Sequence, residues 1–250
     1  MCTLTFASLS GRLRIAFNRD EQRSRAVALP PRLVQCGERA AIMPIDSATG
    51  GTWIGVNSAG LTVCLLNASN SQMLGEMKSA AKQSRGVVVP RLLAAENCRE
   101  AAEFVQDFDA RDLQPFRVIM IERYRWCMAQ SDGAELMIHD IRANIQPLMF
   151  TSSGLGDDVV EPPRRELFNE AVSSGQFEPQ VQDAFHSHRW PERLHLSVYM
   201  SRAEAHTVSR TTIELTSLAK MQYEDMVLSD ATTPATIELE LSRMVGHAKP

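Results

Sequence analysis

Cys2-Thr-Leu-Thr-Phe-Ala-Ser-Leu-Ser-Gly-Arg-Leu-Arg-Ile-Ala-Phe-Asn-Arg-Asp-Glu21 is the stretch of sequence that decides the fold. Polar and apolar residues alternate over 3–8 and again over 12–17, which is typical of half-buried β-strands. Ser10-Gly11 between the two runs supplies turn residues, so we predict a β-hairpin. The second strand runs into a charged cluster. A tight hairpin places that cluster beside the first residues of the chain.

Further strands and two groups of helices are predicted downstream. A second hairpin over 52–57 and 61–67 ends in Asn67, whereas Pro30-Pro31 predicts irregular chain. The other predicted elements are helices over 101–108 (capped by Asn97), 162–172 and 179–185, and strands over 116–121, 124–130, 135–141, 194–200, 207–215, 220–228 and 236–241. Because the helices are grouped and do not alternate with strands, a doubly wound parallel sheet is excluded. We predict an α+β fold of two stacked antiparallel sheets with helices outside, in one domain over residues 1–250.

Composition excludes several classes of function. The chain has 250 residues, of which 44% are hydrophobic, and a net charge of −4, which gives no general attraction to nucleic acid. No apolar run approaches the roughly 18 residues of a membrane span, and no basic segment precedes an apolar one at the start. The five cysteines contain no Cys-x-x-Cys motif, which argues against a zinc site and suggests a reducing, cytoplasmic location. The pair His186-x-His188 would point apart on a helix, so no metal site is expected.

The position of Cys2 suggests a chemical role. Initiator methionine is normally removed when the second residue is small, so we expect the mature chain to begin with this cysteine. A terminal cysteine carries a thiol with a reference pKa of about 8.5 and an α-amine with one of roughly 7.7–8.0. The amine can take the thiol proton and later return it to a leaving group, so one residue supplies nucleophile and base. The alternative is a chance small residue after the start codon.

Several short motifs occur in a fixed order along the chain. They are Met1-Cys-Thr3, Phe17-Asn-Arg-Asp-Glu21, Gly50-Gly-Thr-Trp-Ile-Gly55, the strand ending at Asn67, Gly154-Leu-Gly-Asp157, Glu161-Pro-Pro-Arg-Arg165 and Val208-Ser-Arg-Thr-Thr-Ile213. This set resembles the NRDE family, which is also named after the transport and Golgi organisation protein. That family in turn resembles the N-terminal-nucleophile hydrolases related to bile-salt hydrolase and penicillin V acylase.

The resemblance implies a four-layer αββα sandwich and a role for each matching residue. Cys2 would be the nucleophile, and Arg19 would lower the pKa of its thiol. Asp20 would accept hydrogen bonds from the α-amine. Asn67 would donate its side-chain NH₂ to the oxyanion of a tetrahedral intermediate. Arg210 would complete the charge arrangement near the nucleophile.

Asp157 departs from the family pattern, which has asparagine at this position. A carboxylate cannot donate to an oxyanion unless it is protonated, and its charge would oppose a thiolate. Three outcomes follow: Asp157 is paired with Arg19 or Arg210, its pKa is raised, or the site does not hydrolyse amides. The neighbouring Asp158 shares this ambiguity, because the local match can slip by one residue.

Each assignment has a purely structural alternative. Arg19 and Asp20 can form a surface ion pair worth less than about 1 kcal/mol. Asn67 can cap the end of a strand, and Arg210 can face solvent. The sequence alone does not separate these alternatives from the catalytic roles.

Two functions of different classes are compatible with these residues. The first is a cysteine amidohydrolase that cleaves a non-peptide C–N bond of a small-molecule amide through an acyl-enzyme and needs no cofactor. The second, suggested by the resemblance, is a haem-binding or haem-trafficking protein on the same fold, with noncovalent binding because no haem-attachment motif is present. A scaffold without a small-molecule ligand is a third. Specificity is expected to come from loops near 22–48 and 68–90.

Overall fold

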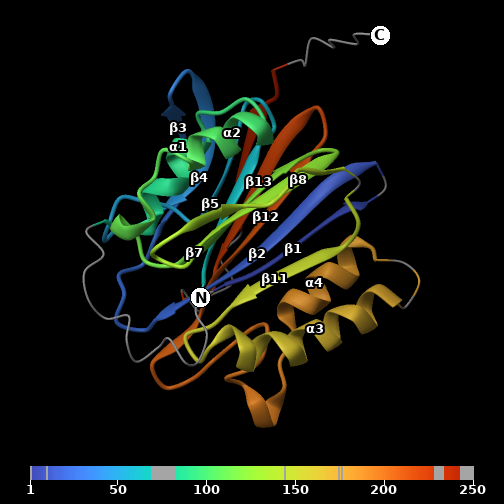
Figure 1. Ribbon diagram of the computed structural model, residues 1–250. Coiled ribbons are helices and arrows are strands. Elements are labelled where there is room, and N and C mark those ends of the chain that lie inside the picture. The colour runs from blue at the N-terminus through green and yellow to red at the C-terminus, as the bar shows by residue number, and fades with distance from the viewer. Residues whose placement is uncertain are drawn as a thin grey trace.

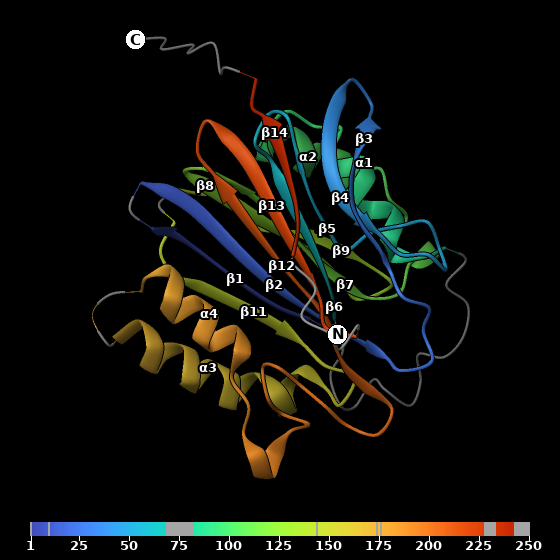
Figure 2. The same ribbon diagram turned by 180° about the vertical axis from the view of Figure 1, so that it is seen from behind.

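Two antiparallel sheets lie face to face, and each carries helices on its outer side (Figures 1 and 2). The computed structural model describes residues 2–9, 11–68, 83–143, 145–173, 175, 177–227 and 234–242. Most of the predicted loop over 68–90 lies outside these residues. Among the described residues, no helix has the length and apolar character needed to cross a membrane.

The first sheet is built around the predicted amino-terminal hairpin. β1 pairs antiparallel with residues 12–19 of β2, and β2 continues through the charged cluster to Gln22. In spatial order the sheet contains β11 (Leu148–Ser152), β1 (Cys2–Leu9), β2 (Arg12–Gln22), β12 (Ala205–Leu215), β13 (Leu218–Asp225) and β14 (Ala235–Glu240).

The second sheet contains the predicted hairpin that ends in Asn67. Its strands are, in order, β10 (Arg142–Ala143), β8 (Arg125–Ser131), β7 (Phe116–Glu122), β6 (Thr62–Asn67), β5 (Ile54–Asn57), β4 (Arg39–Ile45) and β3 (Leu29–Cys36), with β9 (Leu136–Ile138) paired to β8.

Helices cover the outer face of each sheet, which confirms the four-layer αββα sandwich. α3 and α4 pack on the first sheet and α1 and α2 on the second, so three layers of buried apolar side chains separate the four layers of structure. Asn97 caps α2 as predicted, its side chain accepting from the N–H groups of Arg99 and Glu100. The helices are η2 (Arg85–Val87), α1 (Val88–Leu92), α2 (Cys98–Val105), η3 (Ala110–Asp112), α3 (Asp157–Ser173), α4 (Pro179–Ser187) and η4 (Pro191–Arg193).

Several predicted elements differ from the structure. Pro30-Pro31 lies inside β3, which is tolerated because β3 is the edge strand of its sheet and its pairing is irregular there. The strand β11 was not predicted, α3 starts five residues before Pro162, and residues 194–200 form turns instead of a strand. These errors fall where tertiary pairing overrides the local pattern.

The alternation of β1 separates two chemical environments. Cys2, Leu4 and Phe6 point into the core between the two sheets. Thr3 and Thr5 point the other way, toward α3 and α4, where they bond to helix side chains. The thiol of Cys2 therefore belongs to the inner space of the sandwich.

Candidate functional site

A cavity of about 370 Å³ opens at the end of the sandwich where β1 begins and β2 and β6 end. Three predicted site residues and the carboxamide of a fourth line it together: Cys2, Arg19, Asp20 and Asn67. They come from three strands, β1, β2 and β6, of the two sheets. The predicted hairpin accounts for Arg19 and Asp20 near Cys2, and the family resemblance implied the position of Asn67. The other lining residues are Glu21, Gln22, Arg25, Asp46, Thr49, Thr52, Trp53, Leu65, Ser84, Arg85, Gly86 and Gly154.

Cys2 is held between two neighbouring strands. It is the register partner of Arg19 on β2 and of Ser152 on β11. Its backbone nitrogen donates to the hydroxyl of Ser152 at 3.1 Å, and its carbonyl accepts from Thr151 at 3.2 Å. Burial raises the pKa of the thiol, and the carboxylate of Asp20 raises it further, while Arg19 lowers it. The thiol therefore needs a base or a cation to become a nucleophile.

Arg19 lies on the same face of the sheet as Cys2. Its guanidinium donates to Asp46 at 2.6 Å and lies 3.3 Å from Glu21. The same group sits over the ring of Trp53, 4.1 Å from the centroid. Asp46 and Trp53 lie in loops of the second sheet, so their contacts hold the cation between the sheets beside the thiol. Arg19 is thus a buried, anchored residue and not part of a surface pair with Asp20.

Asp20 lies on the opposite face of β2, behind the nucleophile. Its side chain is 1% exposed, accepts from the hydroxyl of Thr207 at 2.6 Å and lies 3.9 Å from the guanidinium of Arg164. Burial raises the pKa of Asp20, and both partners counteract the shift. The predicted hydrogen bond from the Cys2 nitrogen to Asp20 is not present among the described contacts, since that nitrogen donates to Ser152.

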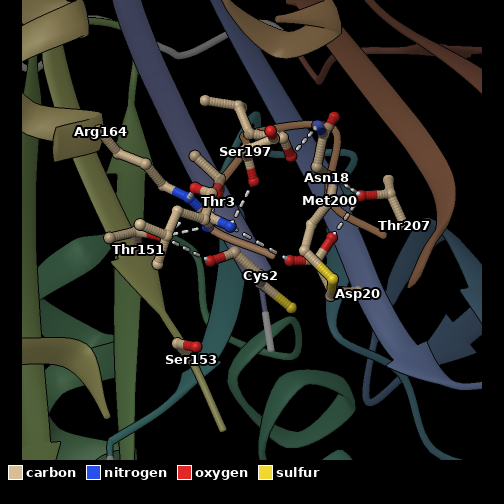
Figure 3. Close-up of polar contacts among 12 residues, drawn as sticks. Cys2, Thr3, Asn18, Asp20, Thr151, Ser153, Arg164, Ser197, Met200 and Thr207 are labelled. Atoms are coloured by element: carbon tan, nitrogen blue, oxygen red, sulfur yellow. Dashed lines mark hydrogen bonds and ion pairs between the residues drawn. The ribbon is translucent and has the colours of Figure 1, made fainter. Parts of the chain in front are cut away.

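Arg164 is the buried centre of a polar network beneath β1 (Figure 3). It donates to the hydroxyls of Thr3 and Thr151 at 2.7 and 2.8 Å. Further bonds reach the carbonyls of Leu196 and Ser197 at 3.0 and 2.6 Å. The network joins α3 and the segment before β12 to the strand that carries the nucleophile. The sulfur of Cys2 points away from it, toward the cavity.

Asn67 lies at the end of β6, on the other sheet. It is half-buried and lines the cavity, so its carboxamide is available to a molecule bound there. Its register partner on β7 is Phe116. Asn67 thus lines the same cavity as Cys2 but comes from the other sheet, and its oxyanion role stays a prediction.

Two predicted site residues lie elsewhere. Asp157 starts α3, where it accepts from the backbone N–H of Ser153 at 2.8 Å and pairs with Arg117 at 2.6 Å. Of the three alternatives for Asp157, pairing with Arg19 or Arg210 is not the arrangement found, because its arginine partner is Arg117. Arg117 neutralises the carboxylate of Asp157, so this carboxylate does not raise the pKa of a nearby thiol as an unpaired negative charge would. Its neighbour Asp158 is exposed.

Arg210 is also not beside the thiol, contrary to expectation. On β12 it lies opposite Asn18, whose side chain faces the helices. Its guanidinium binds Glu224 at 2.6 Å and the hydroxyl of Ser187 in α4 at 2.9 Å. The neighbouring Ser209 is the residue opposite Arg19. Because side chains alternate along a strand, Arg210 points away from the cavity.

Sequence reasoning missed Ser152, Asp46 and Arg164. Only the last had a usable signal: it lies four residues after Val160 and four before Phe168, in the buried stripe of α3. An arginine in such a stripe must be fully bonded, which points to a structural or functional role. Ser152 lies on the strand that was not predicted, and nothing local marks Asp46.

The described cavity does not fit a porphyrin. Haem requires mainly apolar walls and an axial ligand. Charged and polar residues together make up most of the lining, and the one typical axial donor among its described residues is the buried Cys2 thiol. No group of three or more His, Cys, Asp or Glu that could hold a metal ion occurs in the described part of the chain. All five cysteines are buried free thiols.

Several solved structures share the fold at low sequence identity. A penicillin V acylase from Agrobacterium tumefaciens matches with a TM-score of 0.51 and 14% identity, over 97% of this chain and 87% of its own. A C2A mutant of the conjugated bile acid hydrolase from Clostridium perfringens matches with a TM-score of 0.51 and 11% identity over 100% of both chains. An N-acylethanolamine-hydrolyzing acid amidase orthologue from Caenorhabditis elegans matches with a TM-score of 0.56 and 16% identity, over 85% of this chain and 92% of its own.

These likenesses establish an N-terminal-nucleophile-hydrolase-like fold. No curated protein matches the chain in sequence. One family model, described as Transport and Golgi organisation 2, matches residues 1–235. With its amino-terminal hairpin, its cysteine between two sheets and this match over nearly its whole length, the chain belongs to the Transport and Golgi organisation 2 family.

Proposed function

We propose that the protein is a cysteine amidohydrolase that cleaves a non-peptide C–N bond of a small molecule. The observation that carries the proposal is the convergence of Cys2, Arg19 and Asn67 on one cavity, from strands of both sheets. Thiol, cation and carboxamide are the groups that acyl transfer to a cysteine requires. The three similar structures, an acylase, a bile acid hydrolase and an acid amidase, support the same class.

Removal of Met1 is the first step of the proposed activity. It would convert the backbone nitrogen of Cys2 into an α-amine, which Ser152 holds at 3.1 Å in the present structure. The neutral amine takes the thiol proton, and Arg19 stabilises the resulting thiolate. Asp20, anchored by Thr207, lies behind this pair and favours the ammonium form electrostatically.

The thiolate then attacks the carbonyl carbon of the bound amide. A C–S bond forms, and the carbonyl oxygen becomes an oxyanion that accepts from the side-chain NH₂ of Asn67. When the intermediate collapses, the C–N bond breaks and the ammonium group of Cys2 gives its proton to the leaving amine. Water then cleaves the thioester, which releases the acid and restores the thiol.

Mass spectrometry of the full chain, carrying only a carboxy-terminal tag, tests the proposal. Intact mass is expected to show loss of Met1, and iodoacetamide is expected to alkylate Cys2 before any other thiol. Cys64 is the internal control, because it is a buried thiol in the same core. Retention of Met1, or a Cys2 that reacts no faster than Cys64, contradicts the proposal.

The haem-carrier alternative stays a prediction without a described binding site. A titration of the protein with hemin tests it through the Soret band. If the cavity binds haem through the thiol, the Soret shift saturates in the wild type and is lost in Cys2→Ala. We expect no saturable shift that depends on Cys2.

A further inference from the structure

Arg85 differs from the other two arginines that line the cavity. Arg19 and Arg25 share the carboxylates of Asp46 and Glu21, with separations of 2.6 to 3.6 Å. Arg85 has no carboxylate within 4.0 Å among the residues that the structure describes. Its one hydrogen bond to a described residue runs from Nη1 to the carbonyl of Pro115 at 2.8 Å. The rest of its guanidinium is left for a ligand.

The carboxylate of Asp46 has no spare acceptor for Arg85. One oxygen of Asp46 is occupied by Arg19 and Arg25. The other accepts from the N–H groups of Ala48 and Thr49 and from the Thr49 hydroxyl. Among the residues that the structure describes, no carboxylate forms an ion pair with the guanidinium of Arg85.

The backbone fixes Arg85 at the edge of the cavity. It starts η2, whose next residue, Gly86, packs directly against Gly51. A Cβ on Gly51 would lie 2.7 Å from backbone atoms of Gly86, so only glycine permits this approach. The N–H of Thr52 also donates to the carbonyl of Gly86 at 3.1 Å. Arg85 is consequently presented from a rigid segment.

The electrostatic environment of Arg85 favours the binding of an anion. Burial lowers the pKa of Arg85, whereas a thiolate at Cys2 and the carboxylate of Glu21 would raise it. Arginine nevertheless stays protonated in proteins, so partial burial of the charged guanidinium costs desolvation free energy. A bound anion would offset that cost, and a planar carboxylate matches the guanidinium through two parallel hydrogen bonds.

We infer that Arg85 binds a carboxylate of the substrate, so that Cys2 acts on small amides that carry a carboxylate group. This inference rests on the proposed function and names its substrate class. Arg19 and Arg85 then have separate tasks. The first stabilises the thiolate beside it, and the second orients the anionic end of the molecule in the cavity.

Two alkylating reagents of nearly equal size test the assignment without knowledge of the natural substrate. Iodoacetate carries a carboxylate and iodoacetamide carries a neutral amide. In both reactions the thiolate of Cys2 forms a C–S bond and iodide leaves. The rate of each reaction is measured on Cys2 by peptide mass spectrometry, in the protein with Met1 removed.

In the variant Arg85→Gln we expect the iodoacetate rate to fall about tenfold, which corresponds to about 1.4 kcal/mol. The iodoacetamide rate should stay within about twofold. Arg111→Gln is the matched control: it removes the same charge from a side chain that is 77% exposed and does not line the cavity, and both rates should be unchanged. Equal falls with both reagents would mean that Arg85 acts on the thiol and overturn the inference. Unchanged rates would also overturn it.

A measurement on the wild type guards against misfolding of the variant. Sodium acetate is expected to protect Cys2 from iodoacetamide competitively, whereas acetamide at the same concentration and ionic strength is not. Equal protection by the two, or none, contradicts carboxylate binding. If Cys2 reacts with neither alkylating reagent faster than the other thiols, the proposed hydrolase function itself fails. That outcome is distinct from a reactive Cys2 without anion preference.

Discussion

Cys2 and Arg19 are directly opposed in the antiparallel pairing of β1 and β2, and both side chains point into the space between the sheets. The register of one hairpin thus brings the thiol and the cation together. Because side chains alternate along a strand, a slip of one residue would turn Arg19 toward α3 and α4. Asp20 occupies that other face, which explains why adjacent residues of β2 have different tasks.

The first prediction concerns the pKa of the thiol. Removing the guanidinium in Arg19→Gln takes away a charge that lowers the pKa of Cys2, so the midpoint of thiol reactivity should move to higher pH. The measurement is the rate of iodoacetamide alkylation of Cys2 as a function of pH.

Arg25→Gln is the matched control for this shift. It removes a charge that also binds Asp46 but is not paired in register with Cys2. The pH midpoint of Cys2 alkylation should move by clearly less in this variant than in Arg19→Gln. Equal shifts in the two variants would show that the overall charge of the cavity matters and the pairing of Arg19 with Cys2 does not.

The second prediction concerns the network beneath the nucleophile. Arg164→Ala removes a guanidinium with bonds to two hydroxyls and two carbonyls and leaves Asp20 buried without its cation. Loss of one partner of a buried pair typically costs about 3–5 kcal/mol of unfolding free energy. Urea denaturation measures this loss.

The adjacent Arg165→Ala is the comparison for Arg164. Its side chain is 35% exposed and pairs with Glu161 along the surface of α3. Such pairs contribute less than about 1 kcal/mol, so this variant should remain near the wild type. Similar losses in both variants would contradict a special role of the buried arginine.

The third prediction is a pH dependence of stability that comes from His186. This side chain is buried between Thr5 and Asn18, and burial lowers its pKa to about 3. The side-chain NH₂ of Asn18 donates to two backbone carbonyls, so its side-chain oxygen faces His186 and can only accept. The proton of His186 is therefore on Nδ1, and Nε2 accepts from the hydroxyl of Thr5. A second proton would break the bond to Thr5.

The sign of the effect follows from proton uptake. Between pH 6.5 and about 3 the unfolded chain protonates His186 and the folded chain does not, so stability falls as the pH falls. The slope from this group is at most about 1.4 kcal/mol per pH unit. Urea denaturation from pH 7 to pH 5 should show a smaller slope for His186→Gln than for the wild type. A variant slope equal to that of the wild type, or a loss of slope in the control His188→Gln, would contradict the assignment.

The sequence was sufficient for the hairpin, the two-sheet architecture and the approach of Arg19 to Cys2, whereas the place of Asn67 was implied only by the family resemblance. Alternation and turn residues are local signals, and they fix both strand and register. The position of Arg210 was not predictable in this way, because one residue decides which face of β12 it occupies, and the pairing of β12 with β2 is irregular between Thr207 and Ser209. The partner of Asp157 was not predictable either, since Arg117 comes from the other sheet.

Arg85 and Asp46 show a second reason why part of the site could not be predicted from the sequence. Both lie in short connecting segments, and their contacts to the cavity depend on tertiary approach, such as that of Gly51 to Gly86. Composition and periodicity carry no information on such contacts. By contrast, the helical stripe of Val160, Arg164 and Phe168 did contain the information that Arg164 is buried.

The last prediction separates the oxyanion role of Asn67 from its alternative as a strand-end cap. Acylation of Cys2 by p-nitrophenyl acetate passes through a tetrahedral oxyanion, whereas alkylation by iodoacetamide does not. If the carboxamide of Asn67 donates to the oxyanion, Asn67→Ala should slow acylation by about 10²–10³-fold. The alkylation rate should stay within about twofold, because the thiolate itself is unchanged. The measurements are p-nitrophenolate release and the mass of the Cys2 adduct.

Gln22→Ala is the matched control, because it removes another carboxamide from the lining of the same cavity. It should leave both reactions near the wild-type rate, since no role in charge stabilisation is assigned to it. If Asn67→Ala slows acylation and alkylation by the same factor, the side chain maintains the shape of the site as a cap would. A selective loss of acylation requires a donor that acts only when the oxyanion forms, which a cap at the end of β6 does not provide.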